Sequence, residues 1–184
     1  MIKALLALFG ILCLSPGNDP NLLGNDWAKF HQSNIRDQWN VKVGDEISWS
    51  RKAGADSGSA GVYQRIGVLA PGKLLLKMEV RIDSHSLPGS GWWGDKRGGT
   101  GEYPAKIRLD YLDERGRKAF WTHGFLSRKN PNRLKNYTRI KKGEWTKVEL
   151  ELDLGDTAVL VGIRVFGCGW SFKGAVRNLE LVRR

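Results

Sequence analysis

The chain has 184 residues, 41% hydrophobic and 27% charged, a globular composition that excludes a low-complexity chain and suits one domain with a full core. Lysine and arginine exceed aspartate and glutamate by 30 − 19 = 11. A positive charge of this size attracts nucleic acid, anionic membranes or acidic polysaccharides without choosing between them.

The first residues resemble a targeting segment. Lys3 precedes an apolar run from Ala4 to Leu14, and the small residues Ser15 and Gly17 follow it. This order is typical of a secretory signal peptide, and the run is too short to span a bilayer. An apolar element packed on the domain, or an uncleaved anchor, would be the alternatives.

Beyond this segment, short runs alternate between apolar and polar residues with a period of two, as in half-buried strands. The clearest run extends from Leu74 to Asp83, where leucine, methionine, valine and isoleucine occupy every second position. Further runs are predicted at 106–112, 119–125, 145–153, 158–166 and 175–182. In the run 158–166 we expect Val159, Val161, Ile163 and Val165 to point inward. In the last run the alternation breaks around Asn178.

Turn residues separate these runs. Pro71-Gly72 ends one connection, Asp113 to Gly116 predicts a hairpin, and Lys142-Gly143 precedes another strand. Many short strands with this punctuation predict an all-β protein, an antiparallel β-sandwich or barrel. Two long connections, 84–104 and 127–136, are candidates for functional loops.

The order of several motifs resembles the galactose-binding-like jelly-roll domains, the sandwich of many carbohydrate-binding modules. The motifs are Asn21-Leu22-Leu23, Val62 to Ile66, Pro71-Gly72, Tyr103 to Tyr111, Gly143-Glu144-Trp145 and Gly169 to Phe172. The resemblance covers residues 21–183 and implies a jelly roll. Such modules often hold a structural calcium ion, but Asn178 stands where an acidic ligand would be expected, so we predict no metal and no cofactor.

The loop 84–104 carries the most conspicuous residues. Trp92 and Trp93 are adjacent in a glycine-rich polar segment, where two indoles are hard to bury together. Exposed indoles can stack on the apolar faces of sugars while Asp95, Lys96 and Arg97 bond hydroxyl or carboxylate groups. One or both rings folded onto the sandwich would be the alternative.

The polar sides of the strands form a second candidate. If these strands are neighbours, one face gathers Glu79, Arg81, Asp83, Arg108, Asp110, Trp121, His123 and Arg164. Such a face could hold a glycan, with Trp121 as a stacking platform. A solvated face with cross-strand ion pairs is the alternative, and a one-residue error in register would exchange inside and outside.

Other features point away from catalysis. Seven lysines and arginines between Arg128 and Lys142 suit an anionic partner or a solvated edge. His31, His85 and His123 show no metal spacing, and no nucleophile motif is present. Asp83 and Asp110 could be neighbours, as glycoside hydrolysis would require, but nothing else indicates an enzyme. Cys168, among aromatic residues, is expected to be a structural thiol.

These observations predict a signal peptide at 1–17 and a single β-sandwich domain at 18–184, secreted or at the cell surface or in the periplasm. The leading hypothesis is a non-catalytic, monomeric domain that binds a polysaccharide or glycoconjugate, possibly acidic, and no nucleic acid. Its ligand-binding residues would be Trp92, Trp93, Trp121, Arg81, Asp83, Arg108, Asp110 and His123. The alternative is a structural or protein-interaction module that contacts a cell-envelope protein.

Overall fold

The computed structural model describes residues 21–32, 38–52, 58–86, 102–128 and 136–184. Within these ranges the chain forms eleven strands and no helix that could cross a membrane. The strands are β1 (Ala28–Gln32), β2 (Gln38–Lys42), β3 (Glu46–Lys52), β4 (Gly58–Leu69), β5 (Lys73–Ser86), β6 (Ala105–Leu112), β7 (Lys118–Leu126), β8 (Tyr137–Arg139), β9 (Thr146–Asp153), β10 (Val159–Gly169) and β11 (Ser171–Arg183).

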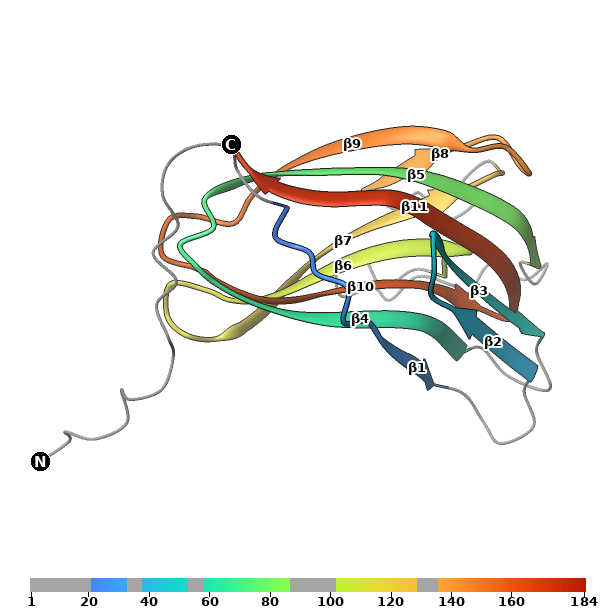
Figure 1. Ribbon diagram of the computed structural model, residues 1–184, viewed down its shortest axis with the longest axis horizontal. Helices are drawn as coiled ribbons and strands as arrows, with labels where there is room; N and C mark the ends of the chain where they lie inside the picture. Colours follow the sequence, from blue (N-terminus) through green and yellow to red (C-terminus); the bar gives the residue numbers. More distant parts are fainter. Residues whose placement is uncertain (1–20, 33–37, 53–57, 87–101, 129–135) are drawn as a thin grey trace, which may run out of the picture.

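The strands form two sheets. Sheet A has the order β1-β4-β10-β6-β7-β8, and sheet B has the order β2-β3-β11-β5-β9. Figure 1 shows them as two layers, with β9, β5 and β11 in one and β6, β10 and β4 in the other. β7 pairs with β8 in parallel, and every other strand pair among the described residues is antiparallel. The predicted all-β antiparallel sandwich is confirmed.

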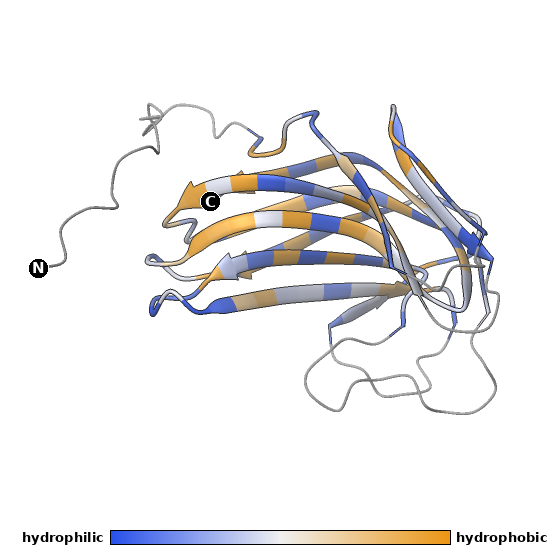
Figure 2. Cartoon of the chain, turned by 90° about the horizontal axis from the view of Figure 1, so that it is seen from below, coloured by the Kyte–Doolittle hydropathy of each residue, from blue (hydrophilic) through white to orange (hydrophobic). Residues whose placement is uncertain are grey.

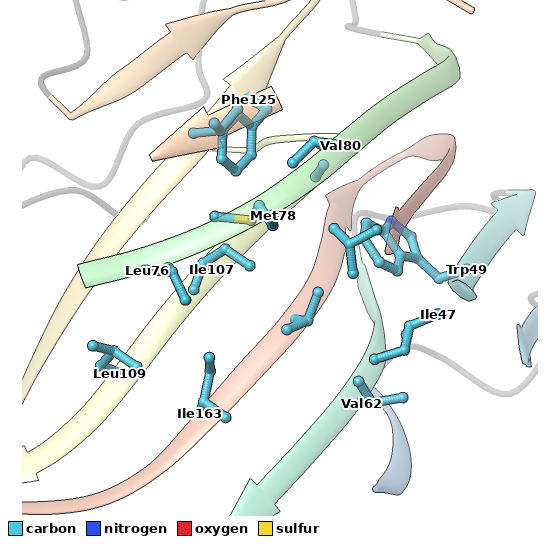
Figure 3. Packing of buried hydrophobic residues seen from close by; sticks show 14 of the residues in the cluster. Ile47, Trp49, Val62, Leu76, Met78, Val80, Ile107, Leu109, Phe125 and Ile163 are labelled. Carbon is cyan, nitrogen blue, oxygen red and sulfur yellow. The ribbon is translucent and has the colours of Figure 1, made fainter. Parts of the chain in front are cut away.

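The core lies between the two sheets and follows the alternation of the sequence. In β5, the five apolar residues from Leu74 to Ile82 at even positions are at most 3% exposed. Hydrophobic and hydrophilic residues alternate along the strands in Figure 2. Figure 3 shows Leu76, Met78 and Val80 from sheet B close to Ile107 and Phe125 from sheet A. Burial of each such side chain stabilises the fold by about 1.5–3 kcal/mol.

Strand β10 departs from the predicted alternation. The register of β10 shifts between Leu160 and Gly162 against both neighbouring strands, which marks a β-bulge. Because the bulge adds one residue, Leu160 is fully buried whereas Val161 is 37% exposed. The expectation that Val159 and Val161 point inward is therefore wrong, while Ile163 and Val165 are buried as predicted.

The register of β11 against β5 shifts between Lys173 and Gly174 and again, at a bulge, between Arg177 and Glu180. Asn178 lies inside it with a left-handed backbone (φ 51°), a conformation that asparagine tolerates better than most residues. Its amide Nδ2 donates to Glu79 Oε1 at 3.2 Å. The break in alternation seen in the sequence at Asn178 is this bulge.

The hairpin between β6 and β7 is confirmed. Gly116 N donates to Asp113 O at 2.8 Å, and Asp113 Oδ1 accepts from the backbone N–H groups of Arg115 and Arg117, both at 2.9 Å. Gly116 has φ 70°, which glycine adopts without steric cost. The turn thereby fixes the register of two strands that carry functional candidates.

Candidate functional site

The outer face of sheet A presents aromatic rings to solvent. Phe30, Tyr63 and Phe120, on β1, β4 and β7, are partly exposed, and Phe120 is 41% exposed. Cross-strand pairing places Tyr63 opposite Arg164, and Arg164 opposite Arg108. Because paired residues point to the same side of a sheet, these side chains share one surface, the aromatic face: Phe30, Tyr63, Arg108, Asp110, Phe120 and Arg164.

Two glycines allow the rings to lie on the sheet. A Cβ atom on Gly162 would lie 2.7 Å from the ring of Tyr63, and one on Gly61 would lie 2.3 Å from the Cβ of Phe166. The absence of side chains therefore provides the space that these aromatic residues occupy. Phe166 in turn contacts Phe30 edge to face, with ring centroids 5.7 Å apart.

A carboxylate holds the two arginines of the face in place. Arg108 Nε donates to Asp110 Oδ1 at 2.6 Å, and Arg164 Nε donates to Asp110 Oδ2 at 2.8 Å. The guanidinium carbon of Arg108 lies 4.2 Å from the ring centroid of Phe120. That of Arg164 lies 5.3 Å from the ring of Tyr63. The charged groups on β10 and β6 thus lie between the rings on β4 and β7.

The face continues into a buried region over β6 and β10. Lys106 Nζ lies 5.6 Å from the ring centroid of Tyr103 and 5.8 Å from that of Phe166. Burial lowers the pKa of Lys106 and raises the pKa of Tyr103 to about 12. Burial also raises the pKa of the Cys168 thiol, which suits a structural thiol better than a nucleophile.

The structure divides the predicted polar face between two surfaces. Arg108, Asp110 and Arg164 lie together on sheet A, whereas Arg81 and Asp83 lie on the outer face of sheet B with Glu79. The expectation of one continuous face is therefore wrong, because β5 belongs to a different sheet from β6 and β10. Asp83 and Asp110 are on opposite sides of the sandwich and do not form a catalytic pair.

The side chains of Trp121 and His123 point toward the core, although the sequence predicted that they point outward. Trp121 pairs with Leu109 and His123 with Ile107, both of which are fully buried core residues. Trp121 packs against the core and stacks on His123, with ring centroids 5.9 Å apart. These side chains lie on the inner face of β7 and do not contribute to the aromatic face.

His123 is held as a neutral imidazole. A ring nitrogen, Nε2, forms a hydrogen bond with Thr138 Oγ1 at 2.9 Å. Burial lowers the pKa of His123 to about 4, because the imidazolium form would lose its hydration. Its role is structural, since it links β7 to β8.

Some predicted residues fall outside the described ranges. Trp92 and Trp93, with Asp95, Lys96 and Arg97, lie in the segment 87–101, and part of the basic run lies in 129–135. Residues 1–20, which include the expected signal peptide, are also outside them. Within the described ranges, no group of three or more histidine, cysteine, aspartate or glutamate side chains is placed to bind a metal ion.

The sequence did not reveal the three rings of the aromatic face. In β7, Phe120 and Trp121 are adjacent, so a period of two cannot tell which ring points outward. The pairing partner could have decided this. Leu109 is strongly apolar and lies opposite Trp121, and paired residues share a face of the sheet, so Trp121 is the ring that points inward. Phe30 lies in a short edge strand with no alternating signal.

No model of a protein family and no curated protein matches the sequence. Among solved structures, 89% of this chain aligns with the enzymatically active domain of tailspike protein 4 of bacteriophage CBA120, at 11% identity and a TM-score of 0.53. The fold is a jelly-roll β-sandwich.

Other similar structures are carbohydrate-binding modules. The CBM22-1 xylan-binding domain of Paenibacillus barcinonensis Xyn10C aligns over 92% of this chain and 97% of its own, at 8% identity and a TM-score of 0.45. The CBM22-1–GH10 modules of Clostridium thermocellum xylanase 10B align over 90% of this chain, at 12% identity and a TM-score of 0.48. This chain covers only 21% of the length of the tailspike chain and 27% of the length of the xylanase chain.

The predicted β-sandwich is thus confirmed by the two sheets and by the alignment with the tailspike domain. At identities this low, the likeness does not transfer a ligand or a set of binding residues.

Proposed function

We propose that this protein binds a polysaccharide on the aromatic face of sheet A and performs no chemistry on it. The observation that carries the proposal is the presence of three partly exposed rings on one face, with two arginines and an aspartate between Tyr63 and Phe120. Solved structures with this fold include carbohydrate-binding modules, so glycan binding is a known use of the architecture.

The chemistry of the aromatic face suits sugars. Aromatic rings stack on the flat C–H faces of pyranose rings, and side chains beside them bond the hydroxyl groups. Arg108 and Arg164 are held by Asp110 through Nε, so their terminal NH₂ groups can donate to hydroxyl or carboxylate oxygens. Preorganised guanidinium groups favour a glycan that carries carboxylate groups.

Two further elements belong to the proposal. The net charge of +11 would concentrate an acidic glycan near the protein. Trp92 and Trp93 lie in the connection between β5 and β6, and we propose that they add stacking area. Export by the N-terminal segment would bring the domain into contact with extracellular or cell-surface glycans.

Affinity electrophoresis against neutral and acidic polysaccharides tests the proposal. Retention is expected with at least one polysaccharide, and Tyr63→Ala or Phe120→Ala should weaken affinity about tenfold, which corresponds to about 1.4 kcal/mol. Trp92→Ala combined with Trp93→Ala should weaken it as well. Trp39→Ala is the matched control, because Trp39 is 39% exposed and lies on sheet B.

Two results would contradict the proposal. The first is no retention on any polysaccharide. The second is a variant with Phe30, Tyr63 and Phe120 all replaced by alanine that remains folded and is retained like the wild type. Folding of each variant is checked by thermal unfolding followed by circular dichroism.

A further inference from the structure

A groove crosses the outer face of sheet B, on the side of the sandwich opposite the aromatic face. Its volume is about 450 Å³, which is enough for one or two sugar residues. It extends over β2, β3, β11 and β5. The residues that line it are Asn40, Lys42, Glu46, Ser48, Trp49, Ser50, Arg81, Asp83 and Lys173.

The register of the sheet explains the hollow shape. Arg81 on β5 pairs with Ala175 on β11, which pairs with Ser48 on β3, which pairs with Lys42 on β2. Long side chains therefore stand on the two outer strands of this row, and short ones lie on the two strands between them. Ser50 and Asn40 extend the floor and one wall in the next row.

Arg81 is fixed in orientation on the wall of the groove. Its guanidinium carbon lies 4.5 Å from the centroid of the Trp145 ring. Arg81 Nε donates to Asp83 Oδ1 at 2.9 Å, and Arg81 Nη2 lies 3.9 Å from Glu46 Oε1. Arg177 also stacks on Trp145, at 4.4 Å. A cation held by a ring and a carboxylate loses little rotational freedom when it binds an anion.

The balance of charge in the groove is positive. Lys42 forms no ion pair with any described residue, and Lys173 Nζ lies 3.7 Å from Asp83 Oδ2 with a side chain that is 59% exposed. With Arg81, these lysines give three cations against two carboxylates. The hydroxyl groups of Ser48 and Ser50 and the amide of Asn40 add hydrogen-bonding groups. The groove thus offers a charged contact surrounded by partners for hydroxyl groups.

We propose that the groove on sheet B is a second saccharide site that takes a negatively charged sugar residue. That the ligand is a saccharide rests on the proposed function, whereas the affinity of the groove for a carboxylate or sulfate rests on its own lining. A domain with sites on both outer faces can bridge two glycan chains, because a short saccharide bound on one face leaves the other face open. This bivalency distinguishes the inference from binding at the aromatic face alone.

Isothermal titration calorimetry with hexagalacturonate, a sulfated dextran oligomer, neutral cellohexaose and hexaglutamate tests the inference. Lys42→Gln with Lys173→Gln should raise the Kd of one component of binding to an anionic oligosaccharide at least tenfold. The combination of Tyr63→Ala and Phe120→Ala should leave that component intact. Carboxylate and sulfate ligands are distinguished by which anionic oligosaccharide binds.

The matched control is Lys73→Gln with Lys147→Gln, which removes the same charge from exposed positions on sheet B outside the groove. Ser50→Leu fills the floor without changing charge and should act like the groove variant.

The inference is overturned if the groove variant binds like the control, if no anionic oligosaccharide binds, or if hexaglutamate binds the groove equally well. Loss of all binding in the aromatic-face variants alone would refute the groove and leave the proposed function standing. Loss of all binding in the groove variant alone would refute binding at the aromatic face and leave the groove site standing.

Discussion

The ring of Tyr63 lies over Gly162 of the neighbouring strand, where an added Cβ atom would approach it to 2.7 Å. The same Cβ would come within 2.6 Å of the carbonyl oxygen of Gln64. One glycine thus positions an aromatic residue of the proposed binding face, so a single methyl group should affect both stability and binding.

We expect Gly162→Ala to destabilise the protein by about 1–3 kcal/mol, because neither contact can be relieved without moving the backbone or the ring. Polysaccharide affinity should fall as Tyr63 is displaced. Gly67→Ala is the control on the same strand pair, since its Cβ would meet nothing within 4 Å. Urea unfolding and affinity electrophoresis measure the two effects, and equal stability of both variants would contradict the packing described.

The bulge in β10 gives a second prediction. Leu160→Ala should cost about 2–5 kcal/mol, because it removes a fully buried side chain. Val161→Ala should change stability by no more than about 0.5 kcal/mol, because Val161 is partly exposed. Chemical denaturation distinguishes them. A larger loss for Val161 than for Leu160 would mean that the strand has no bulge at this position.

The Asp110 carboxylate organises the charges of the aromatic face. Asp110→Asn should weaken both arginine contacts and cost about 0.5–2 kcal/mol at low salt, with a smaller loss at 1 M NaCl. Glu151→Gln is the matched control, because Glu151 and its partner Arg184 are both largely exposed. Unfolding at two salt concentrations tests this, and a salt-independent loss would show that charge pairing is not the cause.

Two histidines should make stability depend on pH. Burial lowers the pKa of His85 to about 4, and the charges of Arg128 and Lys142 add to this. The pKa of His123 is also lowered to about 4, whereas an unfolded chain has a histidine pKa of about 6.5. Between these values the unfolded state binds more protons, so the stability present above pH 6.5 is lost as the pH falls toward 4.

The measurement is the urea midpoint between pH 7.5 and pH 5. We expect it to fall with pH in the wild type and to fall less in the double variant His85→Asn, His123→Asn. His31→Asn, at an exposed position, should keep the wild-type slope. An unchanged slope in the double variant would assign the pH dependence to other groups.

Much of the fold could be predicted from the sequence, because a core-facing strand has to alternate. The β5 run and the β6–β7 hairpin were correct, since Leu74 to Ile82 bury every second residue and Gly116 closes the turn. The bulge at Val161 was missed, although Gly162 beside it is a residue type that often marks a bulge inside a strand. It changes the phase of the alternation, so the residues before it take the face opposite to the one predicted.

The candidate site was less predictable, because its residues come together through sheet assignment. Arg108 and Asp110 were correctly placed on an outward face, but alternation does not say which sheet a strand joins. Arg81 and Asp83 therefore seemed to be their neighbours although they lie on the opposite side. Trp121 was misassigned because Phe120 beside it offers the same aromatic signal with the opposite orientation.

The last two strands of the chain occupy the centres of the two sheets. β10 lies between β4 and β6, and β11 lies between β3 and β5. During synthesis, the earlier strands therefore emerge without the partners that would complete either sheet. Their apolar faces and open edges have to wait for residues 159–183, which makes acquisition of the native state a late and slow event. Chaperone dependence of a nascent chain stalled before β10 would be the cellular sign of this order of assembly.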